Sequence, residues 1–211
     1  RNARKPRSLP EKLEGPRIHL GLQGNYGLML ARFVHQEGAS NGGLTMPGAG
    51  INLEWDAIKG LGFAIKAHAD AALLDPSYPV LQTRGAAALR IGKRGDAPGL
   101  AIQVGGAWRL SSAATSGGPE AGDLFEHQSI WGGHLAIRYG LPSFTLQLQG
   151  EAFPEEFAVR GSALYSLPTL PLWELKPRVG LALDGMLSQT DARLDNIAYG
   201  SQVQLQLMRS F

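Results

Sequence analysis

The last thirteen residues, 199–211, alternate between apolar and polar side chains, and this alternation constrains the fold more than any other feature. In an extended strand, successive side chains point to opposite faces, so one face here is apolar and the other carries amides. Three glutamines in register fit a hydrated interior better than a dry core. The apolar residues are Tyr199, Val203, Leu205, Leu207 and Phe211, and the glutamines are Gln202, Gln204 and Gln206.

This terminal strand resembles the carboxy-terminal assembly signal of bacterial outer-membrane β-barrel proteins. Arg209 departs from that pattern, because the family usually has an apolar side chain there. The resemblance implies a small transmembrane β-barrel in the bacterial outer membrane. The alternative for this segment is the last strand of an ordinary soluble β-protein.

Composition excludes a helical membrane protein. A membrane-spanning helix needs about 20 consecutive apolar residues, and Gly, Lys, His or Asp interrupts every apolar stretch of the 211 residues. The chain has no cysteine, so it has neither a disulfide framework nor a thiolate metal site. The 28 glycines favour tightly curved strands.

Alternation and turn signals together predict ten strands. An even number suits a closed antiparallel barrel. We therefore predict an all-β fold, with a transmembrane barrel over 17–211 and a disordered basic tail over 1–16. The predicted strands are 17–30, 48–58, 62–74, 80–92, 99–111, 127–141, 143–153, 157–167, 173–187 and 197–211.

The connections between these strands predict an orientation. Three of those on one side, 31–47, 112–126 and 188–196, are long and polar, whereas those on the other side are short. Outer-membrane barrels have long extracellular loops and short periplasmic turns, so we expect both termini in the periplasm. All prolines but Pro177 fall in the tail, loops or turns, and Pro177 counts against the ninth strand or marks a bulge.

Aromatic residues cluster at the strand ends, as expected for a chain that places Trp and Tyr at two membrane interfaces. The apolar strand face also carries too many large side chains for the lumen of a ten-strand barrel. We therefore expect this face to contact lipid. The turn-side belt comprises Trp55, Phe63, Tyr139, Phe144, Tyr165, Trp173 and Phe211, and the loop-side belt comprises Tyr26, Trp108, Trp131, Phe157 and Tyr199.

The opposite strand face predicts a lumen filled by paired charges, in which carboxylates meet guanidinium groups. In a soluble sandwich the same residues would form a solvated surface. The predicted luminal network comprises Glu54, Asp56, Lys66, Arg84, Arg109, Arg138, Glu151, Arg160, Arg178 and Asp184.

Four luminal residues are candidates for acid–base chemistry. His68 and Asp70 share a face because they are two residues apart, and Glu151 and Asp184 reach a similar level. The strand count and this chemistry are similar to the omptin family of outer-membrane proteases, whose catalytic acidic and histidine residues line the upper barrel. The chain has no omptin motif and is shorter than an omptin, so an ion-pair network is the favoured interpretation.

A second comparison is with lipid A deacylases, small barrels that use Ser and His at the lipid face. His127 and Ser129 share a face here, but Ser129 and His134 differ by an odd number and point to opposite faces. His19 and His35 are isolated, and we expect them to be structural or exposed. The sequence predicts no metal site and no cofactor.

Charge is polarised along the predicted barrel axis. The basic tail is a candidate contact for an envelope protein, and an acidic loop rim could hold cations that bridge lipopolysaccharide. We expect outer-membrane lipid and lipopolysaccharide as surroundings and no nucleic-acid partner, since the tail lacks interleaved aromatics. The tail cations are Arg1, Arg4, Lys5, Arg7 and Lys12, and the rim acids are Glu37, Asp75, Glu120, Asp123, Glu126, Glu155, Glu156, Asp191 and Asp195.

These features favour a structural anchor or interaction subunit of an envelope assembly. A narrow or gated pore, an outer-membrane hydrolase, and a soluble β-sandwich or lipocalin-like binder are the alternatives.

Overall fold

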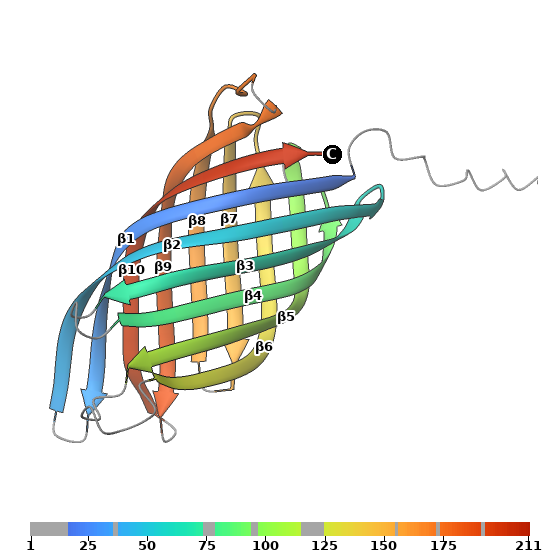
Figure 1. Cartoon of the computed structure of the whole chain (residues 1–211). Helices are drawn as coiled ribbons and strands as arrows, with labels where there is room; N and C mark the ends of the chain where they lie inside the picture. Colours follow the sequence, from blue (N-terminus) through green and yellow to red (C-terminus); the bar gives the residue numbers. More distant parts are fainter. Residues whose placement is uncertain are drawn as a thin grey trace, which may run out of the picture.

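Ten antiparallel strands close into a barrel, as predicted (Figure 1). The computed structural model describes residues 17–35, 38–73, 79–93, 97–114, 125–154, 156–171, 174–190 and 193–211. The strands are β1 (Ile18–His35), β2 (Gly38–Ile58), β3 (Leu61–Leu73), β4 (Pro79–Gly92), β5 (Gly99–Ala114), β6 (Phe125–Gly140), β7 (Phe144–Phe153), β8 (Glu156–Ser166), β9 (Lys176–Thr190) and β10 (Arg193–Ser210).

The first and last strands close the barrel. Each strand pairs with its neighbour in sequence, and β1 pairs with β10 from His19–Ser210 to Arg32–Ile197. Beyond that register, the Arg17 amide donates to the Phe211 carbonyl at 2.8 Å, and the Phe211 amide donates to the Ile18 carbonyl at 2.8 Å. Closure leaves no sheet edge with unpaired backbone groups, which a lipid environment would penalise.

Two of the long loops predicted from the sequence, 31–47 and 188–196, are largely strand in the structure. β1 and β2 continue to the pair His35–Gly38, so most of 31–47 is strand, and β9 and β10 likewise continue to the pair Thr190–Arg193. Gly42, Gly43 and Pro47 suggested a loop from local propensity. Cross-strand pairing overrides that propensity, and Pro47 lies in β2 opposite Tyr26.

Proline placement also differs from the prediction elsewhere. Pro79 is the first residue of β4, where a missing backbone donor is tolerated. Pro177 is the second residue of β9, and its register with β10 shows no bulge there, since Pro177 pairs with Leu207. The register shifts lie instead between Asp56 and Ile58 and between Leu194 and Asn196.

The two faces of the barrel wall are inverted relative to a soluble protein. Thirty-six large apolar side chains of the described residues are exposed on the molecule. Of the eleven buried apolar residues, eight are alanines, so the interior is lined by small side chains among long polar ones. Within the described ranges, no helix is long and apolar enough to cross a membrane.

Candidate functional site: a charged lumen

The structure places the ten charged residues of the predicted luminal network on the inner face of the wall. Seven of them are buried, and the other three, Lys66, Arg84 and Arg160, line an internal cavity. Period-two alternation assigns the inner face correctly in these strands because side-chain direction is a local property. The partners of each charge depend on which strands face one another across the lumen.

One cluster crosses the lumen near the turns. Arg138 Nη1 on β6 donates to Glu54 Oε1 on β2 at 2.6 Å, and three strands separate β2 from β6 around the wall. Arg90 on β4 lies 3.5 Å from Glu54 Oε2 through Nε and also pairs with Asp56. The exposed fraction is 0% for Glu54 and 1% for Arg90, so this end of the lumen is packed rather than open.

A second tie crosses the barrel between β5 and β8. Arg109 pairs with Glu156, and its guanidinium carbon lies 5.4 Å from the centroid of the Phe153 ring. Glu156 was predicted as part of the acidic loop rim, which is wrong for this residue. It begins β8 and points inward, as Ala158 and Arg160 do, where Arg109 neutralises it.

The predicted acid–base group is divided between separate contacts. His68 Nε2 and Asp70 Oδ1 are 2.8 Å apart, and Asn25 Nδ2 donates to the same oxygen at 3.1 Å. Glu151 instead accepts from Gln149 at 2.7 Å and lies near His134, while Asp184 accepts from Arg160 on the neighbouring strand. Asp70 is fully buried.

Two glycines create the space for the His68–Asp70 couple. Gly48 and Gly50 are the β2 residues that pair with Asp70 and His68. A Cβ atom on Gly48 would lie 2.3 Å from Asp70 Oδ1, and one on Gly50 would lie 2.5 Å from His68 Nδ1. Real Cβ atoms essentially never come this close to a neighbour, so a larger residue at either position would force these polar side chains to shift.

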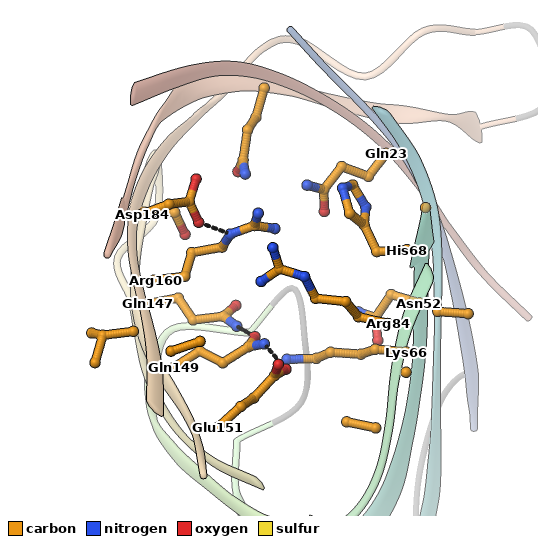
Figure 2. Close-up of a pocket in the computed structure, with 18 of the residues that line it drawn as sticks. Gln23, Asn52, Lys66, His68, Arg84, Gln147, Gln149, Glu151, Arg160 and Asp184 are labelled. Atoms are coloured by element: carbon orange, nitrogen blue, oxygen red, sulfur yellow. Dashed lines mark hydrogen bonds and ion pairs between the residues drawn. The ribbon is translucent and has the colours of Figure 1, made fainter. Parts of the chain in front are cut away.

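The cavity at the centre of the lumen is small. Its volume is about 100 Å³, and Figure 2 shows Lys66, Arg84 and Arg160 directed into it from opposite walls. Pockets for drug-sized ligands measure about 300–1,000 Å³, so this cavity has room only for a few waters or a small ion.

Several polar residues of the lumen were not predicted as part of its network. Asn25 on β1 donates to Gln202 Oε1 on β10 at 2.9 Å as well as to Asp70. His19, predicted as isolated, is 1% exposed, with Nδ1 2.8 Å from Ser210 Oγ and Nε2 3.6 Å from Asp56 Oδ2. The position of Asn25 and His19 on the polar face of their strand was the sequence feature that could have predicted them as luminal residues.

Other predicted residues fall outside the site or outside the description. Ser129 is exposed and His134 is buried, so they lie on opposite faces as their odd spacing predicts. The side chain of His127, Trp173 and the whole tail 1–16 lie outside the described residues, as do most of the rim acids. Among the described residues, no group of three or more His, Asp and Glu side chains could hold a metal ion.

The outer surface of the barrel is apolar, and this indicates the environment in which the barrel lies. The nine most exposed residues of the predicted aromatic belts range from 45% exposed at Trp55 to 72% at Trp131. Trp55 stacks on Phe63 at 5.6 Å between ring centroids, and Trp108 and Trp131 are paired across β5 and β6. Exposed leucine, isoleucine and valine residues lie on the same strand faces. So large an apolar exterior requires lipid.

The chain has the architecture of an outer-membrane β-barrel. The polar lumen and apolar exterior are the reverse of a lipocalin-like binder, which buries apolar side chains inside the barrel.

Comparison with solved structures returns small outer-membrane β-barrels. Neisserial surface protein A is 13% identical, the match covers 91% of this chain and 97% of the neisserial protein, and the TM-score is 0.39. The attachment invasion locus protein Ail of Yersinia pestis is 8% identical, the match covers 93% of this chain and 100% of Ail, and the TM-score is 0.41. The outer membrane protease OmpT of Escherichia coli is 13% identical, the match covers 95% of this chain and 99% of OmpT, and the TM-score is 0.40.

No protein-family model matches the sequence, and no curated protein matches it.

Proposed function

We propose that this barrel is a structural anchor in the bacterial outer membrane that presents its loops and basic tail to other components of the envelope. The packed lumen carries the proposal. Glu54, Arg90 and Arg138 close its turn-side half with almost no exposure to solvent, and Arg109 with Glu156 forms a second tie across it. A barrel closed in this way offers its surfaces, rather than its interior, for function.

The anchor proposal is tested by separating the barrel from the tail. Deletion of 1–16 should leave a heat-modifiable band in the membrane fraction, because closure through β1 and β10 involves only later residues. The same deletion should remove a cross-linked envelope protein that the full chain retains. A matched variant replaces Arg1, Arg4, Lys5, Arg7 and Lys12 by Gln and tests whether charge is responsible. Unchanged cross-linking in both variants would contradict the tail as a contact site.

A narrow pore is the second candidate, and the internal cavity favours it. Arg84 and Arg160 face this space, so a conducting path through it would be anion-selective. Under the anchor proposal, the luminal ion pairs keep the barrel closed, and the purified barrel should show no conductance in planar bilayers. Stepwise conductance that changes in Arg84→Ala or Arg138→Ala would favour the pore over the anchor.

A further inference from the structure

Two cations in the luminal cavity, Lys66 and Arg84, form no ion pair within 4 Å in the described part of the chain. The ammonium group of Lys66 is shielded from solvent and makes no hydrogen bond. Arg84 donates from Nε and Nη2 to the Oε1 atom of Gln82, at 3.0 and 2.7 Å, and that acceptor is neutral. A buried cation without a counter-charge is strongly unfavourable, because burial removes its hydration.

The other charges that line the cavity do not compensate this pair. Arg160 is neutralised by Asp184, with 2.5 Å between Arg160 Nε and Asp184 Oδ1. Glu151 is the remaining carboxylate of the lining, and it accepts from Gln149 and lies 3.8 Å from His134 Nδ1. Among the residues that line the cavity, Lys66, Arg84 and Arg160 therefore face two carboxylates, so the lining carries a surplus of one positive charge. Two further carboxylates lie behind the lining, but Glu54 is held by Arg138 and Arg90, and Asp70 is held by His68 and Asn25.

The two cations are also placed side by side. Lys66 pairs with Ala86 across β3 and β4, and Arg84 lies two residues from Ala86 on the same inner face. Ala86 contributes only a methyl group, so the space between the charged ends stays open. Gln23, Asn52 and Gln147 line the same cavity with amide groups, which can donate hydrogen bonds (Figure 2).

We propose that the luminal cavity binds one small oxyanion of the phosphate or carboxylate class between Lys66 and Arg84. The oxyanion supplies acceptor oxygens for the Lys66 ammonium and the Arg84 guanidinium, and its negative charge offsets the positive charge of the cavity lining. A guanidinium group matches the paired oxygens of such anions better than it matches a monatomic halide. The cavity of about 100 Å³ holds an ion of this size and excludes larger ligands.

The test measures anion-dependent stability of the folded barrel. Unfolded protein is folded into detergent micelles in sodium phosphate, sodium acetate or sodium chloride at equal ionic strength, so that the anion is present while the lumen closes. A ligand that binds only the folded state raises the thermal midpoint as its concentration rises. We expect phosphate or acetate to raise the midpoint and chloride to have a much smaller effect; the more effective oxyanion identifies the preferred class.

Lys66→Gln and Arg84→Gln should each need at least tenfold more oxyanion for the same shift, whereas Lys93→Gln, at an exposed turn position, should respond as the wild type does. In chloride alone, Lys66→Gln should unfold at a higher temperature than the wild type, because it removes a buried charge that has no hydrogen-bond partner. Equal responses of wild type and both cavity variants would overturn the proposal. So would an equal effect of chloride, or a lower midpoint of Lys66→Gln in chloride, which would show that an internal carboxylate already neutralises Lys66.

Discussion

At Glu54, a single carboxylate contacts arginines from two other strands. Arg138 approaches one oxygen at 2.6 Å and Arg90 approaches the other at 3.5 Å, and none of the Glu54 surface is exposed. Burial of one charge is unfavourable, and only the opposite charges make it tolerable. The side chain therefore fastens β2 to β4 and β6 and depends on both partners.

Removal of Arg138 should expose this dependence. Arg138→Ala leaves Glu54 buried with its closest partner gone, and we expect a loss of about 3–5 kcal/mol in the free energy of unfolding. Urea unfolding in lipid vesicles measures this loss. The double variant Glu54→Gln with Arg138→Ala should recover part of it, and Lys93→Ala, at an exposed turn position, should change little. Additive effects of the two single changes would contradict the cross-lumen pair.

Gly48 leaves space on β2 for the side chains of Asp70 and Asn25. A methyl group there would meet the Asp70 carboxylate and the Asn25 amide, so Gly48→Ala should cost about 1–3 kcal/mol of stability through overpacking. Gly24 on β1 is the matched control, because its Cβ would meet no atom within 4 Å. Gly24→Ala should be neutral or slightly stabilising in the same unfolding measurement. Equal losses in the two variants would show that the polar couple does not need the space.

At the scale of the element, alternation predicted the inner and outer faces of the strands but not the whole strand lengths. The identity of inner and outer residues follows from period two, which any short segment reveals. The end of β1 at His35 and the start of β2 at Gly38 depend on pairing with one another, and the glycines at the start of β2 hid this pairing from local propensity. The partners of Arg109 and Glu54 were equally hidden, since distant strands supply them.

The outer face of β6 yields an element-scale prediction. Leu135 lies midway between Trp131 and Tyr139 and is 50% exposed, so it should lie near the middle of the bilayer. Leu135→Arg should cost about 2–4 kcal/mol of stability in vesicles, because a charge at this depth loses its hydration. Leu141→Arg lies in the turn after β6 and should cost about 0–1 kcal/mol. Equal costs would contradict a lipid-facing position for Leu135.

For the whole molecule, closure and an even strand number bring both ends of the described chain to one side. Arg17 and Phe211 are joined there by a backbone hydrogen bond of 2.8 Å. The same side carries the turns after β2, β4, β6 and β8, while the connection after β7 lies at the opposite end. Arg209, the departure from the apolar end pattern, lies 4.7 Å from the Phe211 ring centroid, a cation–π contact suited to an interface.

The orientation of the barrel can be measured directly because the chain contains no cysteine. Pro154→Cys places a thiol in the β7–β8 connection, and Ser143→Cys places one in the β6–β7 turn; both positions are exposed. With the termini in the periplasm, a membrane-impermeant maleimide should label Pro154→Cys in intact cells and label Ser143→Cys only after the outer membrane is opened. Complete labelling of both thiols in opened cells controls for accessibility. The reverse pattern in intact cells would place the termini outside, and the basic tail would then face the medium rather than a periplasmic partner.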